Sequence, residues 1–470
     1  MASTFEGLSS CFGDSNPLPP EWRGRRSQCR GLLAFFQSRF PGPVRREVAF
    51  GFVPGRIEVF GRHTDYAGGR SIVCAIDRGF LFAASPNKRG TVRMAEDSQE
   101  FEPVEFAFGP SITPRRGHWA NYPMTMARRL ARNFGRAAAL RGADIAFSST
   151  LPVGSGMSGS SALMMMTFAA LASLDRLREA APFRENLRGP VDLAVYLACA
   201  ENGQSFRGLR GGRGVGTFGG SEDHAAILTA RPGLVSLFGF CPASLVEEIP
   251  WPQGWKMVVA FSGVRAEKTR EARDKYNLAS RRARDAVGAF NEAFGTRFST
   301  LREVVDRAAG MRGGAWIDGL DSARHGAPGL GDRVRQFMAE DRRHIPEALR
   351  ALREMDLESF GKLLSASHRE SKRWLWNIVP EIDFLQHLAL RLGAAGASGF
   401  GAGFGGSIFA VVPAGGARTF LAAWQAGYAR RSPALESESA FFVTSPGPGI
   451  EVWDRDGPRR LVDLLFQVQA

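Results

Sequence analysis

The stretch PGRIEVFGRHTDYAGG, residues 54–69, sets charged and polar side chains among strand-forming residues. Short apolar runs broken by Gly, Pro or Asn are typical of sheet strands. Five such runs lie in the first quarter of the chain, at 48–53, 57–60, 71–76, 80–84 and 92–94. The first quarter of the chain is therefore predicted to be rich in strands, and this stretch lies within it.

Length and composition predict a globular protein with more than one domain. The chain has 470 residues, of which 44% are hydrophobic and 23% are charged. These fractions are close to those of average soluble proteins, which argues against disordered and fibrous classes. A chain of this length exceeds one ordinary hydrophobic core, so we expect two domains, or two halves that share a cleft.

The order of patterns along the chain predicts an α+β fold. Residues 1–20 look like a frayed leader, and a first amphipathic helix is expected at 22–40. Residues 145–148 are strand-like, and a Gly/Ser loop follows them before an apolar helix at 160–177. The region 266–393 is mostly helical in pattern. We expect a boundary near residue 240, which gives domains at 20–240 and 241–470.

The charge and cysteine patterns limit which partners the protein can bind and in which cellular compartment we expect it. The formal charge is +13, but the basic residues are spread along the chain, which argues against a nucleic-acid partner. The five cysteines are widely spaced and include no Cys-x-x-Cys pair, so neither a disulfide framework nor a zinc site is indicated. No apolar run is long enough to span a membrane. We expect a cytoplasmic protein with no membrane partner.

The loop at residues 151–161 is a candidate phosphate cradle. Its glycines let backbone N–H groups turn toward a ligand, and the N-terminus of the next helix adds partial positive charge. Ser160 stands where a standard P-loop has Lys, so Ser160 is a candidate Mg²⁺ ligand. The alternative is a cluster of helix-capping serines that binds no ligand.

Two further stretches, 214–219 and 401–406, spell Gly-x-Gly-x-x-Gly. A dinucleotide-binding fingerprint follows a strand and opens a helix. Residues 401–406 are instead expected to follow a helix and to lead into a strand at 408–412, and residues 214–219 lie in a polar Arg/Gly loop. Both are therefore interpreted as turns with close backbone approach.

Residues 54–69 resemble the galactokinase signature, which runs P-G-R-x-N-x-I-G-E-H-x-D-Y-x-x-G. Residues 152–162 resemble the second motif of that family, P-x-G-x-G-L-S-S-S-A, and residues 401–407 resemble its third, G-x-G-F-G-G-C. The three motifs occur in family order. By this resemblance the chain is identified as a galactokinase-like member of the galactokinase, homoserine kinase, mevalonate kinase and phosphomevalonate kinase (GHMP) superfamily. That fold has two α+β domains with ATP and substrate in the cleft between them.

The resemblance implies ATP and Mg²⁺ as cofactors. Ser160 and Glu201 match the metal-binding pair, and Trp119 is implied to lie beside the adenine. The residues implied to surround the ATP phosphates are Gly154, Ser155, Gly156, Ser158, Gly159, Ser160 and Ser161.

The resemblance also implies Asp223 as the catalytic base, because Gly220-Ser-Glu-Asp223 matches the family pattern after an insertion at 207–219. The reaction needs a carboxylate that accepts the proton of the anomeric hydroxyl as this oxygen attacks the γ-phosphoryl group. Arg56 is the implied partner that keeps Asp223 ionised. Glu222 is a rival base, and a purely structural salt bridge is the alternative for Arg56 and Asp223.

The implied contacts to the sugar are His63, Asp65, Gly220 and Tyr276, with Arg62 beside them. Arg62 stands where the family has a Glu that binds the 6-hydroxymethyl end of galactose, and Glu58 replaces a family Asn. Either Arg62 binds a C6 carboxylate, as in galacturonate, or it donates to a neutral sugar, or it turns away to pair with Glu58 or Glu222.

The predicted function is an ATP-dependent kinase that phosphorylates the C1 hydroxyl of galactose or a galactose-like monosaccharide. A galacturonate-type 1-kinase is one alternative. The other is a sensor that binds ATP and sugar without turnover, because Gly159 replaces a serine of the phosphate loop. We expect a monomer.

Overall fold

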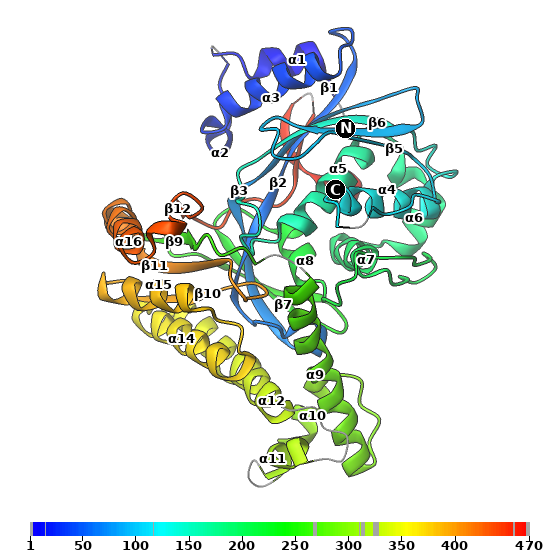
Figure 1. The fold of residues 1–470 in the computed structure, drawn as a ribbon. Helices are drawn as coiled ribbons and strands as arrows, with labels where there is room; N and C mark the ends of the chain where they lie inside the picture. The colour runs from blue at the N-terminus through cyan, green and yellow to red at the C-terminus, as the bar shows by residue number, and fades with distance from the viewer. Residues whose placement is uncertain are drawn as a thin grey trace.

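The structure is a computed structural model. It describes residues 3–14, 16–115, 117–266, 270–309, 311, 315–322, 329–454 and 456–466. The chain forms two bodies, each with its own sheet, and the long strands β2 (Glu47–Phe60) and β3 (Arg70–Pro86) run through the middle of the molecule (Figure 1).

The first body is built on a ten-stranded sheet. Its main path runs β14-β13-β2-β3-β6-β4-β5, and β1, β7 and β8 pair at its sides. The bounds of the other strands are β1 Ser3–Thr4, β4 Thr91–Glu96, β5 Val104–Ala107, β6 Ala143–Ser149, β7 Leu234–Gly239, β8 Ser244–Pro250, β13 Glu451–Asp454 and β14 Gly457–Arg460.

The sequence predicted that strands break at Pro54-Gly55 and between residues 76 and 80. In the structure the strands continue through both places. The two runs at 48–53 and 57–60 form β2, and those at 71–76 and 80–84 form β3. The β2–β3 register shifts between Pro54 and Arg56, where the strand bulges instead of ending. A bulge bends a strand and redirects a side chain, so the break seen in the sequence positions Arg56.

Helices pack against the first sheet. Helix α5 (Gly159–Leu174) begins at the Gly/Ser loop, as predicted, and is buried from Ser161 to Leu174 because its sequence is apolar all round. The other helices of this body are α1 Phe5–Cys11, α2 Pro20–Arg23, α3 Arg26–Arg39, α4 Asn121–Phe134, α6 Ala181–Asn186, α7 Pro190–Asn202, α8 Glu222–Thr229 and α17 Leu461–Leu465.

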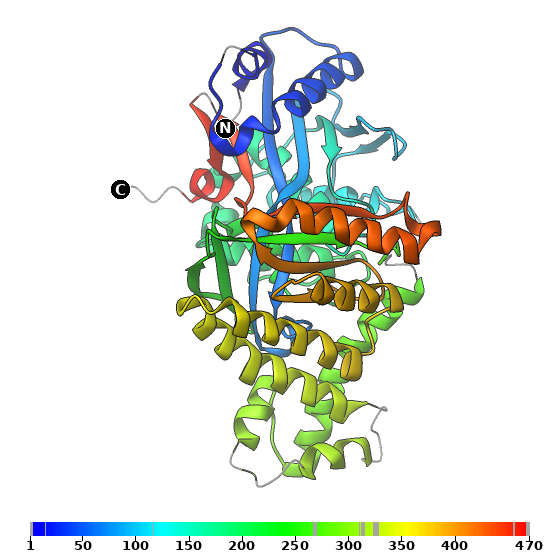
Figure 2. The same ribbon diagram turned by 90° about the vertical axis from the view of Figure 1, so that its left-hand side faces the viewer.

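The second body has a four-stranded antiparallel sheet in the order β10-β11-β9-β12. Its strands are β9 Trp255–Phe261, β10 Gly396–Gly399, β11 Ser407–Pro413 and β12 Ala440–Thr444. Helices α14 (Leu357–Glu370), α15 (Pro380–Arg391) and α16 (Ala417–Arg431) flank this sheet (Figure 2). The glycine loop 401–406 joins β10 to β11, so the expectation that it follows a helix directly was wrong: four residues of strand intervene.

A helical extension protrudes from the second body at the lower end of Figures 1 and 2. It comprises α9 (Arg270–Phe294), α10 (Leu301–Ala308), α11 (Ala315–Ser322) and α12 (Leu330–Met338). Helix α12 continues through a π-helical turn, Ala339–His344, into α13 (Ile345–Arg353). The mostly helical pattern predicted for 266–393 is therefore present in the described part of that region.

Two predictions about chain organisation were wrong. The leader is folded, because β1 pairs with β2 and Leu8 and Phe12 are buried in a core cluster with Trp22. A boundary near residue 240 cuts the paired strands β7 and β8, and β13 returns from the C-terminal half to pair with β2. Pairings between distant segments of a chain leave no local signal in the sequence.

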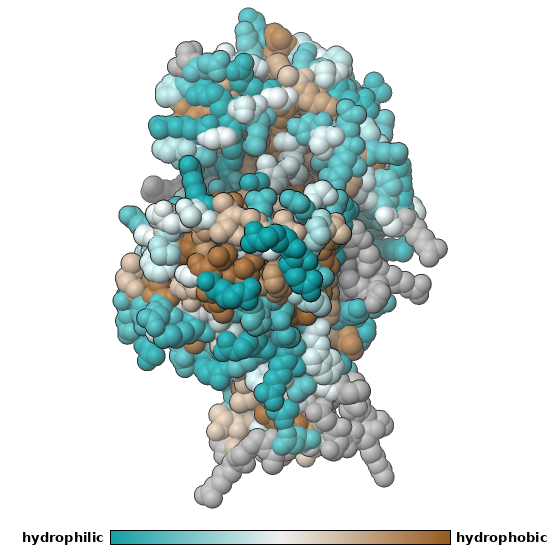
Figure 3. Space-filling model, turned by 60° about the vertical axis from the view of Figure 1, so that its left-hand side comes forward, coloured by the Kyte–Doolittle hydropathy of each residue, from teal (hydrophilic) through white to brown (hydrophobic). Residues whose placement is uncertain are grey.

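The surface is mixed in character. On the side shown in Figure 3, hydrophilic side chains cover most of the surface, and hydrophobic ones gather at the height of α15 and α16 in Figure 2. Within the described residues, no helix combines the length and the apolar character needed to cross a membrane. All five cysteines are free.

The contact between Trp22 and Glu451 predicts a pH-dependent stability. Trp22 Nε1 donates to Glu451 Oε2 at 2.9 Å, and burial raises the pKa of Glu451 from 4.5 to about 7. The Glu451 carboxyl therefore holds its proton more strongly in the folded state than in the unfolded state. The stability that this difference contributes is complete below about pH 4.5 and is lost as the pH rises to about 7.

We expect Glu451→Gln, which remains neutral and keeps an acceptor for Trp22, to reduce this loss by about 1–3 kcal/mol. Urea unfolding at pH 4.5 to 8 measures the effect, with the exposed Glu436→Gln as control. Equal pH profiles for the two variants would contradict the prediction.

Candidate active site

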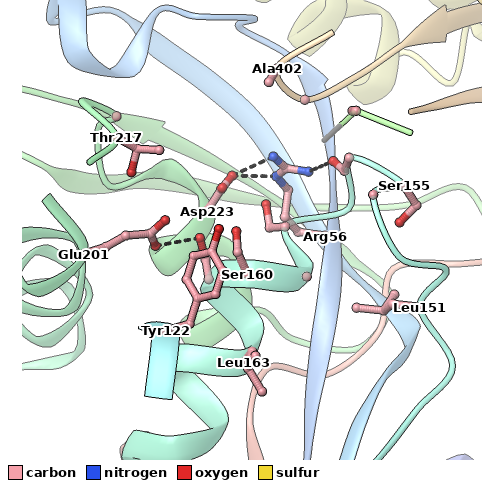
Figure 4. Close-up of a pocket in the computed structure, with 18 of the residues that line it drawn as sticks. Arg56, Tyr122, Leu151, Ser155, Ser160, Leu163, Glu201, Thr217, Asp223 and Ala402 are labelled. Carbon is pink, nitrogen blue, oxygen red and sulfur yellow. Dashed lines mark hydrogen bonds and ion pairs between the residues drawn. The ribbon is translucent and has the colours of Figure 1, made fainter. Parts of the chain in front are cut away.

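A cavity of about 450 Å³ lies where the two bodies meet. The first body contributes β2, the Gly/Ser loop and α8, and the second contributes Tyr276 of α9 and Ala402 of the glycine loop 401–406. Figure 4 shows the labelled side chains around this space. The cavity collects residues from all three glycine-containing motifs.

Arg56 and Asp223 form an ion pair at this cavity (Figure 4). Nε and Nη2 of Arg56 lie 2.8 and 2.7 Å from Asp223 Oδ1, and Nη1 donates to the carbonyl of Gly156 at 2.8 Å. The Arg56 side chain is 5% exposed and that of Asp223 is 31% exposed. Burial opposes protonation of Arg56, but Asp223 and its neighbouring carboxylates outweigh it and raise the pKa of the guanidinium.

Glu222 is one residue from Asp223 but has different surroundings. It is 4% exposed, and its Oε2 accepts a hydrogen bond from Ser71 Oγ at 2.5 Å. Burial raises the pKa of Glu222 well above its ordinary value, and the nearby carboxylates of Glu58 and Asp65 raise it further. Asp223 therefore has a cationic partner that favours the charged form, whereas the surroundings of Glu222 favour the protonated form.

His63 lies in the cavity in a left-handed backbone conformation, with φ 60°. Its Nδ1 is 2.7 Å from the hydroxyl of Tyr66, and its Nε2 is 3.1 Å from the carbonyl of Ala402. Burial and the nearby Arg333 lower the pKa of His63 to about 3. The ring is therefore neutral, donates from Nε2 to the carbonyl and accepts at Nδ1 from Tyr66. Tyr66 lines the cavity and was not predicted.

Asp65, Gly220 and Tyr276 also line the cavity. Asp65 Oδ1 accepts from the backbone N–H of Tyr66 at 2.8 Å, and burial raises the pKa of Asp65 to about 6. A Cβ at Gly220 would lie 2.1 Å from Asp65 Oδ2, so a side chain cannot fit there without moving the carboxylate. The ring of Tyr276 lies 5.3 Å from that of His63 between centroids.

Arg62 turns away from the cavity toward Glu58, which is one of the three alternatives that the sequence left open for it. It is 3% exposed and is not among the described residues that line the cavity. Its Nε lies 3.5 Å from Glu58 Oε1, and its Nη2 donates to Ser398 Oγ at 3.1 Å. A buried carboxylate next to this segment attracts the guanidinium inward. Glu58 lines the cavity in its place.

Three side chains of α12 and its π-helical continuation hold the backbone of the signature loop. Arg333 donates to the carbonyl of His63, and Gln336 Nε2 donates to that of Arg62 at 2.9 Å. Glu340 Oε2 accepts from the N–H of Gly61 at 3.0 Å. The spacing of 333, 336 and 340 places all three on one helix face. This spacing is the only sequence signal that they share, and the sequence reasoning missed it.

The Gly/Ser loop has the backbone shape predicted from its glycines. Gly154 and Gly156 have φ of 72° and 75°, and Ser158, the residue before α5, has φ of 60°. The third glycine motif supports this loop from the second body. A Cβ at Gly401 would lie 2.6 Å from the carbonyl of Gly156, and Ser407 Oγ donates to that of Ser155 at 2.7 Å.

Ser160 and Glu201 both line the cavity, but the hydrogen bond to Glu201 comes from the next serine. Ser161 Oγ donates to Glu201 Oε2 at 2.8 Å, and His224 Nε2 lies 3.2 Å from the same oxygen. One carboxylate with serine hydroxyls matches the oxygen donors that Mg²⁺ takes from proteins when phosphates supply other ligands. The donor set therefore fits the metal.

The far end of the cavity is aromatic. Trp119 packs against Phe101 and Phe147, with ring centroids 5.5 and 5.9 Å apart, and all three line the cavity. Trp119 Nε1 is buried and has no hydrogen-bond partner within the described part of the chain. A group of aromatic rings with one such donor suits a planar heterocycle.

The comparisons with known proteins agree with this geometry. The galactokinase galactose-binding signature matches residues 34–86, the GHMP kinases N terminal domain matches 121–196, and the GHMP kinases C terminal model matches 348–430. The galactokinase of Chloroflexus aurantiacus is 30% identical over 405 residues, which cover 85% of this chain and 92% of that protein. The chain belongs to the galactokinase family.

Other relatives are consistent with this assignment. The galactokinase of Actinobacillus pleuropneumoniae is 27% identical over 367 residues, covering 77% of this chain and 85% of that protein. The solved structure of Lactococcus lactis galactokinase complexed with galactose has a TM-score of 0.71 and 23% identity, and the match covers 89% and 97% of the two chains. The predicted two-domain α+β GHMP fold is confirmed, and the protein is an ATP-dependent sugar kinase.

The contact of Gly220 with Asp65 can be tested by substitution. We expect Gly220→Ala to lower kcat/KM for the sugar by about 100-fold or more, because the new methyl group displaces Asp65. Steady-state ADP release with galactose measures this effect.

Gly31→Ala is the matched control. Gly31 is exposed in the middle of α3, does not line the cavity, and its Cβ would meet nothing within 4 Å. We expect its kcat/KM to stay within about threefold of wild type. Equal losses in the two variants would contradict the assigned contact.

Proposed function

We propose that this sugar kinase transfers the γ-phosphoryl group of ATP to the anomeric C1 hydroxyl of galactose or a galactose-like neutral monosaccharide. The observation that carries the proposal is the Arg56–Asp223 pair. It places one partly exposed carboxylate, held ionised by a buried cation, between the Gly/Ser loop and the pocket that contains His63 and Asp65.

In the proposed reaction, Asp223 accepts the proton of the C1 hydroxyl as its oxygen bonds to the γ-phosphorus. The bond between this phosphorus and the β,γ-bridging oxygen breaks, and ADP leaves. Arg56 offsets negative charge around the transferring group, and its two nitrogens close to Asp223 favour the charged form of that carboxylate. His63, Asp65 and Tyr276 are proposed to hold the sugar hydroxyls.

The nucleotide is proposed to span the rest of the cavity, with adenine beside Trp119 and the phosphates against the loop at 154–161. Bound Mg²⁺ would neutralise phosphate charge during transfer, and Ser160 and Glu201 are the residues proposed to hold it. Trp119 Nε1 would donate to the base, which would give this buried group a partner.

The charge around the sugar pocket favours a neutral sugar over a uronic acid. Four carboxyl side chains line it, from Glu58, Asp65, Glu222 and Asp223. Among the described lining residues the cation beside them is Arg56, which is already paired with Asp223. A sugar carboxylate would be repelled by the Asp223 carboxylate and by any ionised fraction of the other three, without the partner once expected from Arg62.

A monosaccharide panel tests the reaction and the sensor alternative together. We expect galactose to support ADP release and to yield galactose 1-phosphate, while Asp223→Asn lowers kcat by at least about 100-fold. The mutant keeps the size of the side chain, and its sugar affinity, measured by calorimetry, should change little. Sugar binding without product in either protein would instead support the sensor.

Arg62→Met separates the two sugar classes. We expect it to lower the free energy of unfolding by about 3–5 kcal/mol, because it leaves Glu58 buried without its cation. The ratio of kcat/KM for galactose to that for galacturonate should stay within about threefold of wild type. A selective loss of galacturonate turnover would show that Arg62 binds the C6 carboxylate.

A further inference from the structure

The insertion at 207–219 packs on α4 and on the end of α7, beside the active site. Val215 N donates to the carbonyl of Glu201 at 2.8 Å, and Gly212 N donates to that of Gly203 at 3.0 Å. A Cβ at Gly214 would lie 2.3 Å from the Glu201 carbonyl, so this backbone is in direct contact with α7. The end of the insertion lines the active-site cavity through Thr217 and Gly219, and Gly220 follows them there.

On its other side the insertion closes a small hollow of about 10 Å³ against α4. Thr125, Arg128, Arg129 and Arg132 line it from one face of α4, because their spacing of three and four residues places them on adjacent turns. Arg213 of the insertion also lines it. Four arginines and one threonine therefore surround one small hollow.

The positive charge of this cluster is not neutralised. No ion pair within the described residues includes any of its four arginines. Arg128 and Arg132 donate to backbone carbonyls of Ile112, Arg213 and Gly211. Burial lowers the pKa of Arg128, and the charges of Arg132 and Arg213 lower it further, as expected for cations that repel one another.

Two buried polar groups in the hollow have no partner. Arg129 is 4% exposed and Thr125 is 3% exposed. The three side-chain nitrogens of Arg129 and the hydroxyl of Thr125 make no hydrogen bond within the described part of the chain. Arg129 does interact with Tyr196, whose ring centroid lies 5.1 Å away and whose ionised form the guanidinium favours, but no nitrogen of Arg129 reaches it with the geometry of a hydrogen bond. Such groups are costly to bury unless a ligand or water bonds to them.

We propose that this arginine cluster is a second anion site, which binds a phosphate group. Guanidinium groups only donate, and their fork matches the oxygens of phosphate. The hollow is the size of one water molecule, so it admits a single oxygen of the phosphate group. The other oxygens lie at the mouth, where Arg132 and Arg213 are exposed. Free phosphate and a phosphate monoester present the same group to this mouth.

The site is distinct from the active-site cavity, with which it shares no lining residue. The two are neighbours, because Ala200 lines the hollow and the next residue, Glu201, lines the active site. The proposal does not depend on which sugar the enzyme phosphorylates.

Calorimetric titration of the full-length protein with inorganic phosphate tests the proposal. Mg²⁺ and the ATP analogue AMP-PNP saturate the nucleotide site, and acetate salts replace chloride. We expect one equivalent of phosphate to bind wild type, and Arg129→Gln to weaken binding by at least about tenfold. A second titration uses methyl phosphate in place of inorganic phosphate. Equal affinity for the two ligands identifies a site for phosphate monoesters, and much weaker binding of methyl phosphate identifies a site for the free ion.

Because Arg129 is buried, the double variant Arg132→Gln/Arg213→Gln repeats the test with exposed side chains. The matched control is Arg210→Gln, an exposed arginine of the same insertion that does not line the hollow. We expect the double variant to lose affinity and the control to keep it. No phosphate binding by wild type, binding of chloride alone, or equal binding by the double variant and the control would overturn the proposal.

Discussion

The guanidinium of Arg56 joins three parts of the active site that are far apart in the sequence. It contacts Asp223 at the start of α8 and the carbonyl of Gly156 in the Gly/Ser loop. Its Nη2 would lie 3.5 Å from a Cβ at Gly401, so the third glycine motif passes close above it. A buried cation that loses a partner costs several kcal/mol, about 3–5 for removal of one member of a buried pair. Arg56 therefore ties Asp223, the Gly/Ser loop and the second body to one geometry.

The carboxyl groups beneath the sugar pocket divide into two kinds. Burial raises the pKa values of Glu58, Asp65 and Glu222, and a neighbouring carboxylate raises each of them further. Asp223 is the one in direct contact with Arg56, and it is also partly exposed to the cavity. The surroundings therefore favour the protonated form of Glu222 and the charged form of its neighbour Asp223, as the proposed reaction requires. The buried carboxyl group of Glu58 also explains why the Arg62 side chain points inward, because the two side chains are in contact.

The second body shapes the signature loop as well as closing the cavity. Arg333, Gln336 and Glu340 bind consecutive backbone groups of Gly61, Arg62 and His63. A non-glycine residue with positive φ is costly unless its surroundings impose that conformation. These contacts supply that constraint for His63, and the carbonyl of Ala402 orients its ring. A change in the position of α12 relative to β2 would therefore act directly on the sugar pocket.

The sequence by itself determined the family, the α+β class and most of the residues that meet in the cavity, because glycine loops and the Pro54–Gly69 signature are local patterns with a local backbone cause. Only the tertiary structure decided the direction of Arg62, the bond from Ser161 to Glu201, and the return of β13 to the first sheet. It also revealed the contacts of α12 and the unpaired arginines of α4. Each of these depends on which distant segment lies opposite a side chain, and burial, charge pairing and strand register settle that only when the whole chain has folded.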